Sequence, residues 1–179
     1  MRKFLISLVL LLILSATAMG WLVYSRFWRY QTSVDQIRRS LPRDERSMSR
    51  EAANVIKTLE AQGMPWIVSR NILADVAPEP VPISEWQVRG MIWESLLPRR
   101  LSNEEITVLY AHYMQFEGGR GLAFGSQKYF GTSPRQLTAD QAIQLCVIAH
   151  SPKRYSPSHH PEAFSSAVAR YRAKYRTAG

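Results

Sequence analysis

The chain has 179 residues, of which 46% are hydrophobic, and a formal net charge of +9. This length allows one globular domain with a proper core, and the single cysteine, Cys146, excludes an internal disulfide. The four histidines show no metal-ligand spacing, so no metal site and no cofactor are expected. The positive charge predicts attraction to anionic partners such as lipid head groups, pyrophosphate or nucleic acid.

The stretch from Phe4 to Tyr24 contains no charged residue. At about 1.5 Å per residue, a helix of this length reaches about 32 Å, which is enough to cross the core of a bilayer. A cleaved signal peptide is the competing interpretation, because Arg2 and Lys3 form a basic head and residues 16–18 have the small-x-small pattern of a processing site. The anchor is favoured because the apolar run continues past that site with interfacial aromatic residues. We expect residues 1–25 to be a membrane anchor or signal segment, which disfavours nucleic acid as a partner.

Residues 26–48 are rich in arginine, and we expect a basic juxtamembrane stalk that is either solvated or bound to anionic lipid. More basic residues follow the apolar run than precede it, and by the positive-inside rule the domain would stay in the cytoplasm. The very short tail before the run is instead typical of an export signal. We therefore expect a single-pass protein of the inner (cytoplasmic) membrane with its domain on the outer, periplasmic face.

Apolar residues recur at helical spacing from Ala52 to Leu59, and Ser49 is a candidate N-cap for this helix. Gly63, with Pro65 two residues later, is expected to stop this helix. A second apolar segment covers residues 66–77. Three prolines within residues 78–82 then predict a stiff extended connector or turn, because proline cannot continue a helix there.

A capping-box pattern is expected to begin three later helices. In this pattern a hydroxyl residue at the N-cap is followed three residues later by an acid or amide, and then by an amphipathic run. The pairs are Ser84 with Gln87, Ser102 with Glu105, and Thr138 with Gln141. Pro98 is expected to end the first of these helices, and helical spacing returns over residues 161–175. No segment shows sustained strand alternation, so the predicted fold class is mainly α.

The order of motifs in the C-terminal half resembles that of the family 51 glycosyltransferases, which polymerise peptidoglycan from a lipid-linked disaccharide. The matching residues are Ser102, Glu105, Ile106, Leu109, Tyr110, Gly118, Tyr129, Phe130, Gly131, Leu137, Thr138, Pro152, Tyr155, Ser156 and Pro157. The resemblance implies a lysozyme-like helical domain, over residues 49–179, on the outer face of the membrane. Most of the matching residues are of the core and turn types, so they bear on fold more than on chemistry.

Glycan polymerisation needs a general base for the acceptor hydroxyl and cationic groups for the departing pyrophosphate. The family takes its base from a Glu-Asp-x-x-Phe-x-x-His motif, which this chain lacks. The nearest string, Asp44-Glu45-Arg46, has neither the aromatic residue nor the histidine. The family's second carboxylate aligns with Pro98, and Glu94 lies one helical turn earlier, so Glu94 is the candidate catalytic acid; an ordinary surface glutamate is the alternative.

Five residues are candidates for binding the substrate. Arg89 aligns with a family lysine and keeps its positive charge, although a solvated arginine is an equal alternative. Ser102 matches the family serine at the start of the next helix, and His112 replaces a family asparagine near the cleft. Lys153 and Arg154 are basic residues that would line a cleft entrance together with Arg89.

A second resemblance involves the lytic transglycosylases, in which a catalytic Glu-Ser pair precedes a Gly-x-x-Gly-Leu segment. Glu94-Ser95 and residues 118–122 are similar to these motifs, although their separation is longer here. In that case Glu94 would protonate the glycosidic oxygen, which requires an apolar setting to raise its pKa. Trp86 and Trp93 are either that setting or ordinary core residues.

Three hypotheses for function follow. The first is a membrane-anchored protein that binds lipid-linked peptidoglycan precursor or a glycan strand, with lost or weak polymerase activity. The second is an active glycosyltransferase or lytic transglycosylase that uses Glu94, with a divalent metal implied only in that active case. The third is a non-catalytic module that docks to a cell-wall synthase.

Overall fold

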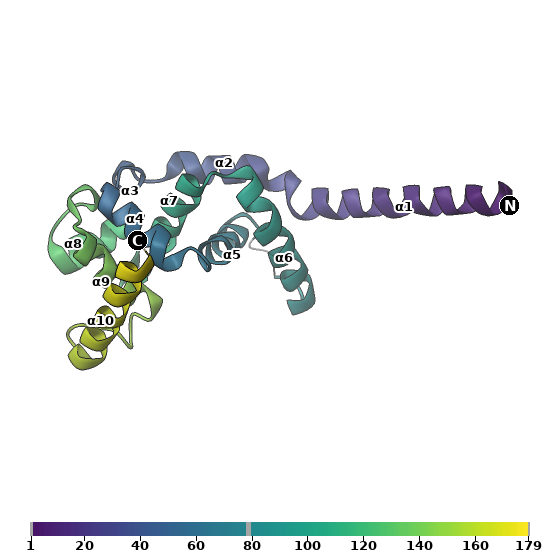
Figure 1. Ribbon diagram of the computed structural model, residues 1–179. Coiled ribbons are helices and arrows are strands. Elements are labelled where there is room, and N and C mark those ends of the chain that lie inside the picture. Colours follow the sequence, from purple (N-terminus) through teal and green to yellow (C-terminus); the bar gives the residue numbers. More distant parts are fainter. Residues whose placement is uncertain (1, 78–79, 179) are drawn as a thin grey trace.

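The computed structural model describes residues 2–77 and 80–178, and nearly all of its regular structure is helical (Figure 1). In chain order the elements are α1 (Arg2–Arg26), η1 (Trp28–Tyr30), α2 (Gln31–Ser40), α3 (Arg43–Arg46), α4 (Arg50–Glu60), α5 (Met64–Val76), α6 (Ile83–Arg100), α7 (Asn103–Tyr113), β1 (Gln115–Phe116), β2 (Gly119–Arg120), α8 (Leu122–Phe130), η2 (Pro134–Gln136), α9 (Ala139–His150) and α10 (Pro161–Ala178). The two short strands pair antiparallel. The predicted mainly α fold class is therefore confirmed.

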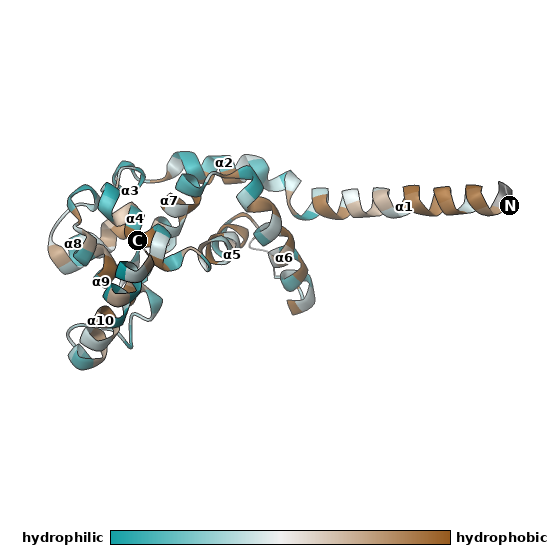
Figure 2. Ribbon diagram, viewed as in Figure 1, coloured by the Kyte–Doolittle hydropathy of each residue, from teal (hydrophilic) through white to brown (hydrophobic). Residues whose placement is uncertain are grey.

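Helix α1 projects away from the rest of the molecule as a single straight helix (Figure 1). It begins the one segment among the described residues that is long and apolar enough to cross a membrane, and its apolar side chains are exposed. Figure 2 shows hydrophobic residues along most of its length. A signal sequence would meet the same criterion, so both interpretations of residues 1–25 stay open.

Three of the predicted helix starts are confirmed. The Ser49 hydroxyl accepts a hydrogen bond from the backbone N–H of Ala52 at 3.0 Å and caps α4. Ser102 with Glu105 and Thr138 with Gln141 form complete capping boxes at the starts of α7 and α9. In each box two orphan N–H groups of the first turn are satisfied reciprocally, which explains why these sequence signals were sufficient.

The prediction for α6 was wrong at both ends. The helix begins at Ile83, and Pro82 rather than Ser84 occupies the N-cap position. It also continues through Pro98 to Arg100, because Leu97 and Leu101 on either side are both buried and hold the last turn in place. Of the predicted connector 78–82, residues 78–79 lie outside the described residues, and residues 80–82 are not helical.

Two groups of helices form the domain. Helices α4, α9 and α10 pack together, α5 and α6 form a hairpin, and α7 contacts both α4 and α5. Trp93 of α6 is fully buried, and its indole Nε1 donates to the carbonyl oxygen of Arg26 at 2.7 Å. Trp93 is therefore a core residue, and it joins the end of α1 to the α5–α6 hairpin.

Residues 26–48 are folded against the domain, whereas the sequence suggested a stalk. They form η1, α2 and α3, and bury Phe27, Val34, Leu41 and Glu45. The many arginines of this segment suggested a solvated stalk, but Val34 and Ile37 share one side of α2 and pack on the core. The expected boundaries of the three segments stay a prediction.

Candidate functional site

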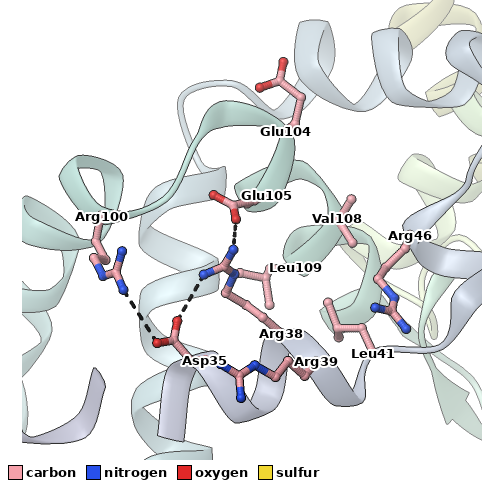
Figure 3. Close-up of a pocket in the computed structure, with 10 residues that line it drawn as sticks. All are labelled: Asp35, Arg38, Arg39, Leu41, Arg46, Arg100, Glu104, Glu105, Val108 and Leu109. Carbon is pink, nitrogen blue, oxygen red and sulfur yellow. Dashed lines mark hydrogen bonds and ion pairs between the residues drawn. The ribbon is translucent and has the colours of Figure 1, made fainter. Parts of the chain in front are cut away.

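A pocket of about 530 Å³ lies between α2, α3 and α7 (Figure 3). Its α7 wall is formed by residues at helical spacing, so that Glu105, Val108 and Leu109 share one face. Charged residues of both signs surround this apolar floor. The lining residues are Asp35, Arg38, Arg39, Leu41, Arg46, Arg100, Glu104, Glu105, Val108 and Leu109. The volume is in the range of small-molecule sites.

The four pocket arginines differ in their pairing. Arg38 is held between Asp35, at 3.0 Å, and Glu105, as Figure 3 shows. Arg100 lies 3.6 Å from the other oxygen of Asp35. Arg39 and Arg46 are exposed, and their guanidinium groups make no hydrogen bond or ion pair among the described residues. Two guanidinium groups are thus available for an anionic ligand, and a guanidinium can bind phosphate or carboxylate through two parallel hydrogen bonds.

A buried acid lies next to this pocket. Glu45 of α3 is only 3% exposed, and its Oε2 lies 2.7 Å from Nδ1 of His112 on α7. Its Oε1 approaches Gly121, the N-cap residue of α8, so closely that a Cβ at Gly121 would overlap it. The carboxylate therefore lies close to the positive end of the α8 dipole as well as to the imidazole.

Glu45 belongs to the Asp44-Glu45-Arg46 string, which is the nearest in this chain to the family's base motif but has neither its aromatic residue nor its histidine. No pattern within that string marks Glu45 for burial, because the burial arises from α7 and α8, which lie far along the chain. His112, a predicted substrate-binding residue, is instead engaged with Glu45, and its side chain is 19% exposed.

Glu94, the predicted catalytic acid, lies on the exposed side of α6. It is not among the residues that line the pocket, and it makes no hydrogen bond or ion pair with the residues that the structure describes. Trp93 next to it points into the core. The apolar setting that would raise the pKa of a catalytic glutamate is therefore not formed around Glu94 in this conformation.

The predicted substrate-binding arginine, Arg89, is paired within the fold. Its Nε lies 2.9 Å from Glu85, which also contacts Arg26 at 3.1 Å. The hydrogen bond from Arg89, together with that from Arg26, lowers the pKa of the Glu85 carboxyl. The Arg89 side chain is only 12% exposed, although its buried Nη1 has no hydrogen-bond partner among the described residues. Arg89 therefore stabilises the junction of α1 and α6.

The other predicted residues do not converge on one cleft. Ser102 uses its hydroxyl in the capping box of α7. Lys153 and Arg154 are exposed in the segment between α9 and α10, and Arg154 lies 5.5 Å from the ring centre of Tyr155. Figure 1 shows α6 and the α9–α10 segment at well-separated parts of the molecule. Arg89 therefore does not line a common entrance with Lys153 and Arg154.

Glu60 is a half-buried acid that was not among the residues predicted from the sequence. It ends α4, and its charge adds to burial in raising the pKa of Tyr110, a buried α7 residue. Burial, followed by the same charge, raises the pKa of Tyr171 on α10 to about 12. The sequence held a signal, because Glu60 follows the buried Ile56 by four residues and so shares the apolar face of α4.

Among the described residues, no group of three or more histidine, cysteine, aspartate or glutamate side chains is arranged to hold a metal ion. Cys146 is buried in α9, as expected of a structural thiol, and burial raises the pKa of the thiol well above its ordinary value.

Comparison with known proteins agrees with the motif order. The model of the Transglycosylase family matches residues 80–175, which comprise α6 to most of α10. Penicillin-binding protein 1C of Escherichia coli K12 is 35% identical over 78 residues, which cover 42% of this chain and 10% of that protein. Penicillin-binding protein 1A of Aquifex aeolicus VF5 is 27% identical over 79 residues, covering 44% of this chain and 11% of the relative.

The chain thus spans about a tenth of the length of these curated relatives. Glu45, Glu60, Arg39 and Arg46 all lie outside the matched residues, whereas Glu94 and Arg100 lie within them. The family match covers more than half of the chain, in the segment where the motif order was seen. The chain therefore belongs to the transglycosylase family.

Proposed function

We propose that this chain is a membrane-anchored, transglycosylase-like protein that binds lipid-linked peptidoglycan precursor or a glycan strand, and that it polymerises glycan weakly or not at all. Family membership supports the substrate class. The proposed binding is supported by the pocket between α2 and α7, where the guanidinium groups of Arg39 and Arg46 make no ion pair among the described residues. A lipid-linked precursor carries a pyrophosphate at the membrane surface, and α2 follows α1 directly in the chain.

The positions of the acids support weak polymerisation. A general base must reach the acceptor hydroxyl within hydrogen-bond distance, directly or through one water. Glu94 is exposed and lies outside the pocket lining, and Glu45 is buried against His112. Glu104 and Glu105 do line the pocket, but Glu104 is paired with Lys57 at 2.9 Å and Glu105 with Arg38. Both acids that line the pocket are therefore engaged with a basic side chain, and the other two do not reach it.

The test uses the full chain in detergent micelles with labelled lipid-linked disaccharide, and measures retention and chain growth separately. We expect retention with little growth. Replacing both free arginines (Arg39→Gln with Arg46→Gln) should weaken retention about tenfold or more, because each charge-assisted hydrogen bond contributes about 1.5–3 kcal/mol. The matched control is Arg43→Gln with Arg50→Gln, which removes the same charge from exposed sites outside the pocket. Equal loss in both pairs would show that only net charge matters.

Glu60 supports the second candidate, an active enzyme. Glu60 is half-buried, and its charge acts on Tyr110 and Tyr171, so it is an acid near the core that a substrate hydroxyl would have to reach. If chain growth is observed, Glu60→Gln and Glu94→Gln separate the two candidate acids. The variant that abolishes growth while keeping precursor retention identifies the base, whereas growth in both variants eliminates both residues.

We also propose that α1 is retained as an anchor in the cytoplasmic membrane, with the domain on the outer face. A Ser158→Cys variant tests this orientation, because Ser158 is exposed and the native Cys146 is buried. A membrane-impermeant maleimide should label this variant in spheroplasts without lysis. Labelling that requires lysis would place the domain in the cytoplasm, and loss of the N-terminal segment in mass spectra would show a cleaved signal peptide.

A further inference from the structure

A second groove, with a volume of about 410 Å³, lies between α4 and the end of α10. Its lining residues are Asn54, Lys57, Thr58, Tyr175 and Arg176, and none of them lines the pocket between α2 and α7. Of these five, only Tyr175 belongs to the family-matched residues 80–175. The family match therefore assigns no role to this groove.

Two packed helices hold the groove in place. Its three α4 residues, Asn54, Lys57 and Thr58, are spaced three and four positions apart, so their side chains share one face of the helix. The end of α10 is tied to α4, because Lys174 Nζ donates to the carbonyl oxygen of Leu59 at 2.6 Å. The lining side chains are thus carried by regular helices that contact each other, and not by a loop.

The groove is positively charged. Lys57 and Arg176 line it, and no acid is among the described residues that do so. The pocket between α2 and α7 differs in this respect, because Asp35, Glu104 and Glu105 line it together with its arginines. The groove therefore favours an anionic ligand, and it offers no carboxylate to hold a metal cation.

Both cations of the groove have donors to spare. Arg176 is exposed, and its guanidinium makes no hydrogen bond or ion pair with the residues that the structure describes. Lys57 Nζ lies 2.9 Å from Glu104, but the Glu104 side chain is 72% exposed, and such surface ion pairs are weak. Figure 3 shows the Glu104 carboxylate turned away from the other residues of the first pocket. An ammonium group has three donors, so Lys57 can contact a ligand as well as Glu104.

The other lining residues are polar and uncharged. Within the described part of the chain, the Asn54 amide, the Thr58 hydroxyl and the Tyr175 phenol make no side-chain hydrogen bond. These groups can donate to, or accept from, the hydroxyl groups of a ligand. An apolar ligand would leave all of them without a partner, which disfavours it.

We propose that the groove between α4 and α10 binds a small oxyanion that also carries hydroxyl groups, of the class of a sugar phosphate or a sugar acid. The Arg176 guanidinium would take the phosphate or carboxylate through two parallel hydrogen bonds, with Lys57 as a second positive charge. Asn54, Thr58 and Tyr175 would contact the hydroxyl groups. The site is separate from the proposed precursor pocket, so this inference goes beyond the proposed function.

The test uses the full chain in detergent micelles with Arg39→Gln and Arg46→Gln, which remove the free guanidinium groups of the first pocket. Thermal unfolding is followed by tryptophan fluorescence at constant ionic strength. The added compounds are glucose 1-phosphate, glucuronate, neutral glucose, inorganic phosphate and acetate. Arg176→Gln removes a groove cation, and Asn54→Asp places a carboxylate in the groove. Arg170→Gln is the matched control, because Arg170 is exposed on the same helix and does not line the groove.

We expect a charged sugar at about ten times its Kd to raise the melting temperature by about 3–6 °C. Arg176→Gln and Asn54→Asp should each lose most of this rise, and Arg170→Gln should keep it. A rise with glucose 1-phosphate alone would assign a phosphate group to the ligand, and a rise with glucuronate alone would assign a carboxylate.

Three outcomes would overturn the inference. They are no rise with either charged sugar, a rise no larger than that with glucose, phosphate or acetate, and an equal rise in Arg176→Gln and Arg170→Gln. The last would show a general effect of anions on stability. Each of these outcomes would leave the proposed precursor binding standing, because retention is measured with the first pocket intact.

Discussion

Glu45 Oε2 lies 2.7 Å from Nδ1 of His112, and this contact joins α3 to the last turn of α7. The Glu45 side chain is 3% exposed, so its carboxyl oxygens are removed from water and require a hydrogen-bond partner. The pair also holds the segment that follows α1 against the family-matched part of the chain, since α3 precedes residue 80 and α7 follows it. The contact is therefore a structural link between the N-terminal arginine-rich segment and the transglycosylase region.

Removing His112 should destabilise the protein. We expect His112→Ala to lower the free energy of unfolding by about 1–3 kcal/mol, because it leaves the buried Glu45 carboxyl without its hydrogen-bond partner. Glu45→Gln combined with His112→Ala should recover part of that loss, since the buried acid is then absent. Urea unfolding followed by circular dichroism measures both. The control is Asp44→Asn on the same helix, which is 61% exposed and should change stability by less than about 0.5 kcal/mol. A cost as small as that for His112→Ala would contradict the role of the pair.

Gly121 should not tolerate a side chain. Its φ is +94°, and a Cβ there would overlap Glu45 Oε1. Gly131 separates the two causes, because its φ is also positive, at +63°, but a Cβ would meet nothing within 4 Å. We expect Gly131→Ala to cost about 1 kcal/mol from the backbone alone and Gly121→Ala clearly more.

Gly63 provides the neutral control for that series, because it lacks a positive φ and the nearest atoms would lie 3.9 Å from a Cβ. The melting temperature should be highest for Gly63→Ala, lower for Gly131→Ala and lowest for Gly121→Ala. Equal losses at positions 121 and 131 would show that overlap with Glu45 contributes nothing.

Low pH should reduce the stability of the junction between α1 and α6, where Glu85 pairs with Arg26 and Arg89. Hydrogen bonds from Arg89 and Arg26 lower the pKa of Glu85 below its ordinary value of 4.5. A carboxyl with a lowered folded-state pKa contributes stability that is fully present above the unfolded pKa and is lost as pH falls through the folded pKa. Glu85→Gln should therefore destabilise the protein at neutral pH, and this difference should shrink as the pH falls below 4.5 and disappear at acid pH below the folded-state pKa of Glu85. Denaturant unfolding at both pH values measures it.

The exposed Glu117 in the glycine-rich turn supplies the control for the acid prediction, because its carboxyl makes no ion pair among the described residues. Glu117→Gln should leave the acid limb of the stability curve unchanged. A difference between wild type and Glu85→Gln that is the same at neutral and acid pH would mean that the pair is not the source of stability.

Trp93 should stabilise the fold both through its hydrogen bond to Arg26 and through its packing in the core. Trp93→Phe keeps an aromatic ring against Phe27 but removes the hydrogen bond to the Arg26 carbonyl, so we expect a cost of about 1–3 kcal/mol. Trp93→Ala also opens a cavity in the core and should cost about 3–5 kcal/mol. Thermal unfolding of the two variants gives the comparison. Identical losses would show that packing has no part in holding α6 to the end of α1.

The helical ends of the domain could be read from local residue patterns. The N-caps of α4, α7 and α9 are confirmed because capping involves residues only three positions apart. The predicted start of α6 was wrong because the local pattern offers two boundaries, Pro82 and Ser84, and the helix uses Pro82. Its passage through Pro98 depends on the buried Leu97 and Leu101, which a short window of sequence cannot show.

The candidate site was less predictable. Glu94 was predicted as the catalytic acid because it lies one helical turn before the position of the family's second carboxylate. In the structure it lies on the exposed side of α6. Glu45 and Arg38 were assigned to a stalk, yet each contacts a residue of α7 that lies 67 residues further along the chain. The sequence by itself determined the helical class, the family and the apolar N-terminal helix, because these depend on periodicity, motif order and composition. Only the tertiary structure decided which acids are buried and which arginines stay unpaired, because desolvation and pairing depend on side chains that approach from other helices.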